Sequence, residues 1–369
     1  MKDKTIDALA AIFLFIFLAY GAAALDDAIY PKAIVDTAGR TVSIPVPVER
    51  IIVLNSDAAE AVVTLGAGDM IVGITEETQD RSSHLPGLKD KQVIGTSQMG
   101  GEIDYELIGE IATAGNGEPS DLVVIGFSGV GKDYGAFEVE KKVAPFGIIN
   151  IGLDFYQPEN LSAEVTKLGV ILNRDKEASN YLIWKDEKRA EIEKAVVGLS
   201  LPRVYLERSP KYGLGDLVTF GNGSGLDDLT KMAGGRNIAE DLEKSAHVTW
   251  EWVLSEDPEV IIRTMSPEGT MGWEKGPSED TLELKKTTNE ILERPGAKSI
   301  SAVKNGQVFI VYSDMLYGME SVAGLAYLAK ILHPESDLDP ASIYKEYLER
   351  LGLEFPEDRI FVYSEDQLS

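Results

Sequence analysis

Short runs of consecutive apolar residues alternate with amphipathic stretches along the first half of the chain. Such runs are typical of strands buried on both faces of a sheet, and they occupy residues 50–54, 70–74, 92–94, 121–125 and 147–151, with a shorter edge strand expected at 42–47. Stretches with helical spacing lie between them at 58–65, 102–111 and 137–143. Strands that alternate with helices in this way predict a parallel sheet covered by helices on both faces.

The alternation stops at residue 159, where a long helical region begins. Leu161, Val165, Leu168 and Leu172 form one apolar stripe, and residues 175–197 then remain helical in character. A helix of about 23 residues would be about 35 Å long, which is long for an ordinary globular helix. We therefore expect a rigid helical connection rather than a flexible linker.

The second half of the chain repeats the pattern of the first. The segment 49–54 is echoed at 201–206, and the segment 119–125 is echoed at 257–262. The sequence therefore predicts an α/β fold of two similar lobes with parallel-type sheets, joined by a long helix, with a ligand cleft between the lobes. The expected division is an N-terminal lobe at 33–158, a connecting helical spine at 159–198 and a C-terminal lobe with a terminal helix at 199–369.

The N-terminus indicates export. Lys2 and Lys4 precede an uninterrupted apolar run at residues 8–25, which ends in the small residues Ala22-Ala23-Ala24. This is the pattern of a secretory signal, with cleavage expected near Ala24. The run is also just long enough to span a bilayer, so residues 1–25 are either a signal peptide or a membrane anchor. Both interpretations place the remaining chain outside the cytoplasm, in the periplasm or at the cell surface.

Composition narrows the classes of function. The chain has 369 residues, of which 35 are basic and 61 acidic, giving a formal net charge of −26. So acidic a surface repels nucleic-acid phosphates, and we expect no nucleic-acid partner. Cysteine is absent and the histidines are only His84, His247 and His333, which argues against thiolate chemistry and against a metal centre built from several histidines. We expect no resident metal and no cofactor.

One glycine-rich segment imitates a nucleotide-binding loop. Gly126-Phe-Ser-Gly-Val-Gly131-Lys132-Asp133 follows a predicted strand and matches G-x-x-x-x-G-K, but Asp133 stands where such a loop needs Ser or Thr to bind magnesium. A loop whose backbone amides and Ser128 line the cleft is the better interpretation. The sequence contains no G-x-S-x-G elbow, and no spacing suggests a Ser–His–carboxylate group. We therefore expect no enzyme, with an exported α/β enzyme as the alternative from another class.

Several segments resemble, in order and spacing, the substrate-binding proteins of ABC importers for iron–siderophore, haem and cobalamin-type ligands. Asp36-Thr-Ala-Gly-Arg-Thr-Val-Ser-Ile-Pro, followed by Glu49-Arg-Ile-Ile-Val-Leu, is similar to the entry strands of that family, and Ala58-Ala-Glu60-Ala-Val-Val-Thr-Leu-Gly is similar to its first helix. Residues 119–125 resemble a PDLVI-type strand of the family, and residues 226–237 and 295–311 match in the second half. The resemblance runs from about residue 35 to residue 353.

The resemblance implies a two-lobed receptor of the helical-backbone class that captures a metal chelate and delivers it to an ABC permease with its ATPase. A ferric siderophore or related chelate is the first expectation, and a corrinoid (cobalamin) or haem is the alternative within the class. A chelate already fills the coordination sphere of its metal, so its receptor needs shape, aromatic faces and a few polar groups. The protein is expected to be a monomer.

The resemblance also implies which loops face the cleft. They contain Asn55, Ser56, Gln98, Met99, Ser128, Tyr156, Tyr212, Met271, Trp273 and Tyr317. Aromatic residues in such loops suit apolar or π-rich ligands, although each can instead belong to the core. Arg208 and Arg263 either bind ligand carboxylates or take part in structural ion pairs. In the family an acidic residue on each lobe contacts the permease; Glu60 occupies the first position, and Asp228 stands where the second is usually a glutamate.

Overall fold

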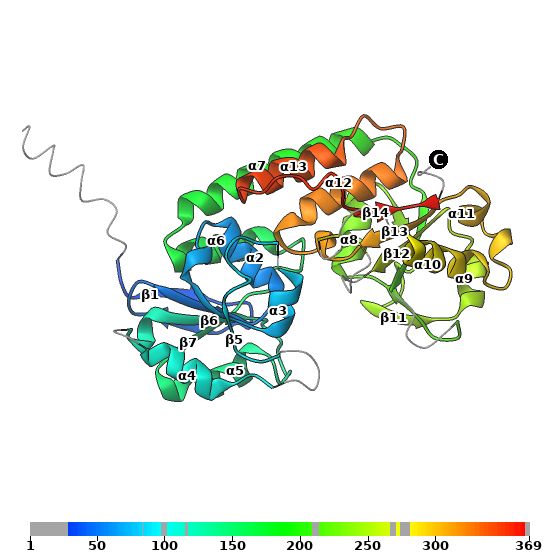
Figure 1. Ribbon diagram of the computed structural model, residues 1–369. Helices are drawn as coiled ribbons and strands as arrows, with labels where there is room; N and C mark the ends of the chain where they lie inside the picture. Colours follow the sequence, from blue (N-terminus) through cyan, green and yellow to red (C-terminus); the bar gives the residue numbers. More distant parts are fainter. Residues whose placement is uncertain are drawn as a thin grey trace, which may run out of the picture.

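Two α/β lobes stand side by side in the computed structural model and are joined along one side by a long helix (Figure 1). The structure describes residues 29–82, 84–96, 102–114, 117–208, 214–265, 271–273 and 281–365. The joining helix is α7 (Asp175–Val196), whose 22 residues agree with the predicted connection. At 1.5 Å per residue α7 is about 33 Å long, so it reaches from one lobe to the other.

The sheet of the N-terminal lobe is parallel throughout. Its strands lie in the order β5-β4-β3-β6-β7, with bounds β3 (Arg50–Val53), β4 (Ile71–Ile74), β5 (Gln92–Val93), β6 (Leu122–Gly126) and β7 (Ile149–Gly152). Around it lie α2 (Ser56–Thr64), α3 (Glu76–Arg81), α4 (Tyr105–Thr113) and α5 (Ala136–Val143). The apolar runs of the sequence therefore form the strands that they predict, and only α3 has no counterpart in the predicted pattern.

A small hairpin precedes this sheet. The sequence predicts an edge strand at 42–47, whereas β2 (Thr41–Ile44) pairs antiparallel with β1 (Lys32–Val35) in a separate sheet. Arg40 fastens the hairpin to the lobe, because its guanidinium donates to Asp36 Oδ2 at 2.6 Å and to the Asn150 carbonyl at 3.1 Å. The predicted strand is therefore present, but it does not extend the parallel sheet.

The expected α/β fold of two lobes is confirmed, and the sheet of the C-terminal lobe is parallel at its centre and antiparallel at its edges. The central strands β8 (Arg203–Arg208), β12 (Val260–Met265) and β13 (Val308–Tyr312) are parallel, and β10 (Arg236–Asn237) pairs parallel with β8. The flanking strands β9 (Leu217–Phe220), β11 (Ser245–Val248) and β14 (Val362–Tyr363) pair antiparallel. Only residues 209–216 connect β8 to β9, too few for a parallel crossover, so the chain returns antiparallel. The helices of this lobe include α8 (Gly225–Met232), α9 (Trp250–Glu256), α10 (Leu282–Leu292) and α11 (Ser301–Lys304).

Polar caps begin the helices that follow the strands. The Asn55 side chain accepts from the Ala58 amide at 2.8 Å at the start of α2, and Thr75 accepts from the Thr78 amide at 3.3 Å at the start of α3. Such caps satisfy amides that have no partner within the helix. They fix sharp exits from β3 and β4, so the residues just beyond these strands gather at one edge of the sheet.

The two lobes share one core. A continuous cluster of buried apolar side chains includes residues of both lobes and of the helices α6 (Leu161–Leu172), α7, α12 (Ser321–Leu332) and α13 (Pro340–Arg350). Figure 1 shows α12 and α13 beside α7, and the Tyr181 hydroxyl of α7 donates to the Met319 carbonyl at 2.6 Å. The connection between the lobes is therefore packed and stiff. Within the described ranges no helix combines the length and apolar character needed to cross a membrane, and the run at 8–25 lies outside those ranges.

Candidate ligand-binding cleft

A cavity of about 580 Å³ is lined by residues of both lobes. The N-terminal lobe contributes most of the wall, and the C-terminal lobe contributes Arg208 at the end of β8 and Asp314 and Tyr317 after β13. The complete lining is Leu54, Asp57, Arg81, Ile103, Phe127, Gly129, Tyr134, Asp154, Tyr156, Arg208, Asp314 and Tyr317. Cavities of about 300–1,000 Å³ are usual for small-molecule sites, so this cleft has the size of a ligand site.

The position of the cavity follows from the parallel sheet. Leu54, Phe127 and Asp154 each come just after a strand of the N-terminal lobe, namely β3, β6 and β7. The ends of β6 and β7 lie level, because Gly126 pairs with Gly152. Parallel strands bring their carboxyl ends to the same edge of a sheet, where ligands of such folds bind.

Aromatic rings form one wall of the cleft. The Phe127 ring meets the Tyr156 ring edge to face at a centroid distance of 5.8 Å, and it meets the Tyr134 ring in the same way at 6.3 Å. Gln157 Nε2 donates to the Tyr156 hydroxyl at 3.0 Å, which holds that ring in place. These edge-to-face contacts leave ring surface for an apolar or π-rich ligand.

Charged groups of both signs surround Tyr317. Asp57, Asp314, Arg81 and Arg208 all act electrostatically on its hydroxyl, and burial is the main reason that the pKa of Tyr317 is raised to about 12. Arg81 Nη2 lies 3.8 Å from Asp314 Oδ1, and the Ser313 hydroxyl donates to the same oxygen at 3.0 Å. The polar part of the cleft is therefore centred on the junction of the two lobes.

Asp57 is the least satisfied carboxylate in the cleft. Among the described residues no hydrogen bond or ion pair engages its oxygens. Burial, followed by repulsion from Asp314 and reinforced by Asp154, raises the pKa of Asp57 to about 6, although Arg81 opposes the shift. A cationic group placed beside Asp57 would stabilise its ionised form.

Asp154, by contrast, is held by the glycine-rich loop. Its oxygens accept from the Ser128 amide at 2.8 Å and from the Ser128 hydroxyl at 2.5 Å, and both residues are buried. The expectation that Ser128 lines the cleft is therefore replaced by a supporting role, in which Ser128 orients Asp154. The residues of this loop that reach the cavity are Phe127 and Gly129.

The structure brings together three of the predicted ligand residues, Tyr156, Arg208 and Tyr317, in one cavity lining. Asn55 and Ser56 lie at the start of α2, next to Asp57 but outside the lining, and Asn55 serves there as the helix cap. Gln98, Met99 and Tyr212 lie outside the described residues.

Met271 is buried in the C-terminal lobe and Trp273 lies between the lobes, and neither belongs to the cavity lining. Met271 is 2% exposed. The Trp273 ring stacks on His84 at a centroid distance of 4.4 Å, and its Nε1 donates to the Tyr344 hydroxyl at 2.9 Å. Burial lowers the pKa of His84 to about 3, so this stack is uncharged at neutral pH. The expected contact of Trp273 with ligand is thereby replaced by a contact between the lobes.

Arg263 belongs to a buried ion network. Its guanidinium lies 2.9 Å from Glu207 and 2.6 Å from Glu290, and Arg294 binds the same Glu207 at 2.6 Å. Of the two interpretations that the sequence leaves open for Arg263, the structural ion pair is the one present. Arg208 takes no part in this network.

Glu60 is enclosed, which corrects its expected place at a docking surface. It is 8% exposed, and its carboxylate accepts from the Met319 amide at 3.0 Å and from the Tyr347 hydroxyl at 2.5 Å. Burial, and next the charge of Glu320, raise the pKa of Glu60 well above its usual range. A carboxylate held in this way joins the lobes.

Asp228 remains accessible. It lies half-buried on α8, and burial together with repulsion from Glu159 and Asp227 raises its pKa. Asp227 beside it is buried and bound to Lys231 at 2.6 Å. The two neighbouring aspartates thus differ in exposure, because Asp227 lies inside the lobe and Asp228 lies at its surface.

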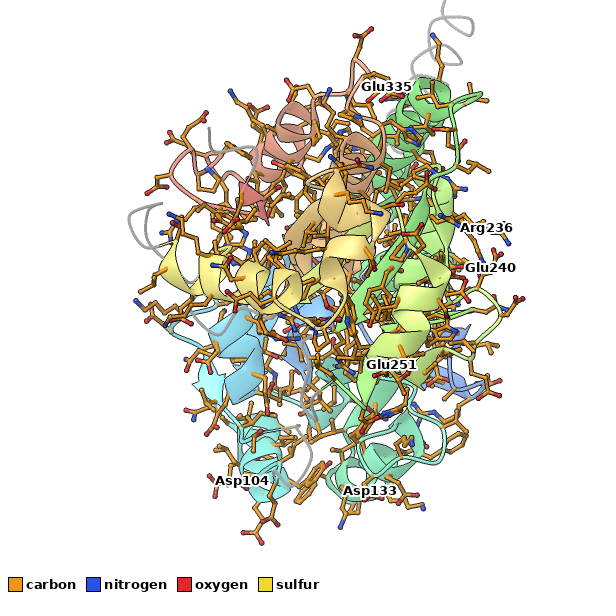
Figure 2. The ribbon with its side chains drawn as sticks, turned by 90° about the vertical axis from the view of Figure 1, so that its right-hand side faces the viewer. Asp104, Asp133, Arg236, Glu240, Glu251 and Glu335 are labelled. Carbon is orange, nitrogen blue, oxygen red and sulfur yellow. The ribbon has the colours of Figure 1, made fainter. Side chains whose placement is uncertain are left out.

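The segment that imitates a nucleotide loop points its charges away from the cleft. Lys132 and Asp133 are exposed, and Figure 2 shows Asp133 projecting from the outer end of the N-terminal lobe. A turn closes this segment, because the Gly135 amide donates to the Lys132 carbonyl at 2.9 Å before α5 begins. Figure 2 also places Asp104, Glu251 and Glu335 on outer surfaces, so acidic groups are spread over the molecule.

The sequence reasoning missed most of the charged lining. Asp57, Asp154 and Asp314 carried a usable signal, since each follows a buried strand within a few residues. Arg81, at the C-terminal end of α3, carried none. Among the described residues no group of three or more histidine, aspartate or glutamate side chains is arranged to hold a metal ion.

Comparison with a family model places this cleft in a known class. Residues 51–315 match the model of the family described as "Periplasmic binding protein". The chain belongs to this family. The match spans the parallel sheet of the N-terminal lobe, α7 and the strands of the C-terminal lobe as far as β13. It therefore includes every residue of the cleft lining except Tyr317. No curated protein matches the chain in sequence.

Solved structures share the fold over nearly the whole chain. The TroA-like periplasmic binding protein FepB of Veillonella parvula is 23% identical, with a TM-score of 0.72 over 90% of this chain and 99% of its own. MolA of Haemophilus influenzae, bound to molybdate, is 18% identical, with a TM-score of 0.66 over 88% and 99% of the two chains. CeuE of Helicobacter pylori, in a nickel–histidine complex, is 20% identical, with a TM-score of 0.66 over 87% and 95%.

Proposed function

We propose that the protein is the solute-binding receptor of an ABC importer, which captures a metal chelate outside the cell and delivers it to the permease. The observation that carries this proposal is the cleft, whose lining combines aromatic rings with charged side chains from both lobes. A ligand in the cleft touches both lobes at once. Its binding energy therefore favours the arrangement in which the two lobes are held against it.

An iron–siderophore-type chelate suits this lining. Tyrosine and phenylalanine rings and guanidinium groups recognise the outer surface of a chelate, because its metal is already enclosed by its own ligands. Haem or a corrinoid offers a similar combination of a flat apolar face and polar edges, and is the alternative ligand. The solved relatives carry ligands as different as molybdate and nickel–histidine, so they support solute binding in general rather than one ligand.

Export and delivery complete the proposal. The apolar run at residues 8–25 behind Lys2 and Lys4 supports export, with the run either cleaved or retained as an anchor. The mature chain acts as a monomer with lobes 33–158 and 199–369 about the spine 159–198. Asp228 supplies an accessible carboxylate for a basic group of the permease, whereas Glu60 does not.

Calorimetric titration tests the proposal. The full-length chain is titrated with ferrichrome, ferrioxamine B, ferric citrate, haem and cyanocobalamin, and we expect one-to-one binding of at least one of them. Tyr156→Ala should weaken that binding about tenfold, because an aromatic contact contributes about 1.4 kcal/mol. Phe137→Ala, which removes an exposed ring outside the lining, is the matched control. Absence of binding for all five compounds would contradict the chelate proposal.

A further inference from the structure

The charged groups of the cleft do not all neutralise one another. Asp314 lies 3.8 Å from Arg81, and Asp154 accepts two hydrogen bonds from Ser128. Asp57 and Arg208 remain. Neither has a hydrogen-bond or ion-pair partner among the described residues, although both line the cavity and both act electrostatically on Tyr317. A ligand is therefore the natural partner for each of them.

The two unengaged groups belong to different lobes. Asp57 lies in the first turn of α2 in the N-terminal lobe, and Arg208 ends β8 in the C-terminal lobe. Asp57 lies among groups that disfavour its charge, since burial and the carboxylates of Asp314 and Asp154 together raise its pKa to about 6. An ammonium group would relieve this repulsion, and the rings of Tyr317 and Tyr156 in the same lining present faces that attract a cation.

A ligand without positive charge would leave Asp57 in an unfavourable state. If the cleft closed over a purely anionic chelate, Asp57 would have to take up a proton or stay ionised beside two other carboxylates. Arg208, in contrast, offers donors that match negatively charged oxygens such as those of hydroxamates or carboxylates. The two unengaged charges of the cleft, Asp57 and Arg208, thus have opposite sign and belong to different lobes.

From this division we infer that the ligand carries a free ammonium group that binds Asp57 in the N-terminal lobe, together with anionic oxygens that bind Arg208 in the C-terminal lobe. This inference rests on the proposed function, because it concerns the same cleft. It specifies a chelate whose outer surface bears both charges, and it disfavours strongly anionic chelates.

The test compares two chelates that differ only in this charge. Ferrioxamine B is a ferric trihydroxamate with one free ammonium group, and N-acetylation removes that charge while the iron coordination stays the same. We expect the full-length chain to bind ferrioxamine B about tenfold more tightly than its N-acetyl derivative, the size of effect seen for hydrogen bonds between charged groups. Raising the pH from 5 to 7.5 should strengthen ferrioxamine B binding, because Asp57 loses its proton while the ammonium group keeps its own.

Three variants separate the roles. Asp57→Asn should remove both the preference for ferrioxamine B and its pH dependence, while binding of the N-acetyl derivative changes less than twofold. Arg208→Ala should weaken both chelates. Asp69→Asn, which changes an exposed aspartate outside the cleft, should alter neither.

The outcomes distinguish the inference from the proposed function. Equal binding of the two chelates, or equal weakening of both by Asp57→Asn, overturns the inference and leaves the receptor function in place. Binding of ferric citrate or haem, with no binding of either ferrioxamine, has the same meaning. If ferrichrome and cyanocobalamin also fail together with all of these compounds, the proposed function falls with the inference.

Discussion

Two carboxylates on α2, one turn of helix apart, have opposite surroundings. Asp57 lines the cleft with no hydrogen-bond or ion-pair partner among the described residues, whereas Glu60 is enclosed between the lobes by the Met319 amide and the Tyr347 hydroxyl. In both cases burial is the main cause of a raised pKa. The difference is that Glu60 has fixed donors from the other lobe and Asp57 has none. One short helix therefore places one carboxylate in the cleft and another in a lock between the lobes.

The lock is made of several side chains. Glu320, also buried, accepts from the Tyr344 hydroxyl at 2.5 Å, and Tyr344 stacks on Tyr347 at a centroid distance of 6.4 Å. Tyr181 of α7 joins the same region through the Met319 carbonyl. These groups join α2 directly to α13 and, through Met319, to α7. Any closure about the spine must therefore occur with this contact in place or must break it.

Removing the Glu60 carboxylate should have the largest effect on stability. Glu60→Ala leaves the Met319 amide buried without an acceptor, and it leaves the Tyr347 hydroxyl with only the longer contact to the Thr64 hydroxyl at 3.2 Å. This loss should lower the free energy of unfolding by about 3 kcal/mol. Urea denaturation measures this change. Glu106→Ala, an exposed glutamate on α4, is the matched control and should change stability by less than about 0.5 kcal/mol. A similar small change for Glu60→Ala would show that the lock contributes nothing.

Truncating Trp273 should have the next largest effect, and it should fall on stability rather than on ligand binding. Trp273→Ala removes the stack on His84 and the hydrogen bond to Tyr344, which together should cost about 2 kcal/mol. Chelate affinity, measured on the folded variant by calorimetry, should stay within twofold of the wild type. A large loss of affinity at unchanged stability would return Trp273 to the ligand site.

A structural feature of this protein is predictable from the sequence where residues that are neighbours in the chain determine it. Apolar runs and helical stripes predict the strands of the N-terminal lobe and α7, because burial on both faces and helical periodicity are local patterns. The cleft is predictable in outline, since Tyr156 and Tyr317 follow strands and Arg208 ends one. Glu60 could not be placed, because its partner Met319 is 259 positions away.

The same reasoning explains the remaining site residues. A residue type alone does not tell whether Arg263 meets a ligand or Glu207, since that choice depends on the pairing of β8 with β12. The sequence places Ser128 in the glycine-rich loop after β6. The direction of its side chain depends on Asp154, which follows the neighbouring strand β7. Parallel sheets bring together segments that are distant in the chain, so the partners of these side chains cannot be predicted from the sequence alone.

The pH dependence of stability should separate the two carboxylates further, with a smaller effect. An acid whose pKa is raised by folding binds its proton more tightly in the folded state, so its contribution to stability is lost as pH rises from its usual range through the raised pKa. For Asp57 this window lies between about 4 and about 6, and for Glu60 it begins near 4.5 and extends higher.

Glu60→Gln isolates the contribution of Glu60. The free energy of unfolding of Glu60→Gln minus that of the wild type should increase as pH rises from 5 to 8. The wild type loses stability in this range as Glu60 ionises, whereas glutamine carries no charge to be buried. Thermal unfolding of both proteins at four pH values in this range, at constant ionic strength, checks the trend. A difference that is independent of pH would mean that Glu60 does not titrate in this range. The matched variant Asp57→Asn should show its trend at lower pH, mostly below pH 6.

Reversing the charge of Asp228 should have the smallest effect on the isolated protein and a clear effect on transport. Because Asp228 lies half-buried near Glu159, an arginine there can pair with Glu159, so Asp228→Arg should leave unfolding and chelate affinity nearly unchanged. If Asp228 meets a basic group of the permease, like charges now oppose each other, and uptake of iron chelate by cells should fall about tenfold. Glu251→Arg is the control, since Figure 2 shows Glu251 on the outer face of the C-terminal lobe, on α9 rather than on α8. Normal uptake with Asp228→Arg would remove Asp228 from the docking surface. Because Glu60 is enclosed, the chain would then have to meet its permease through residues other than these two.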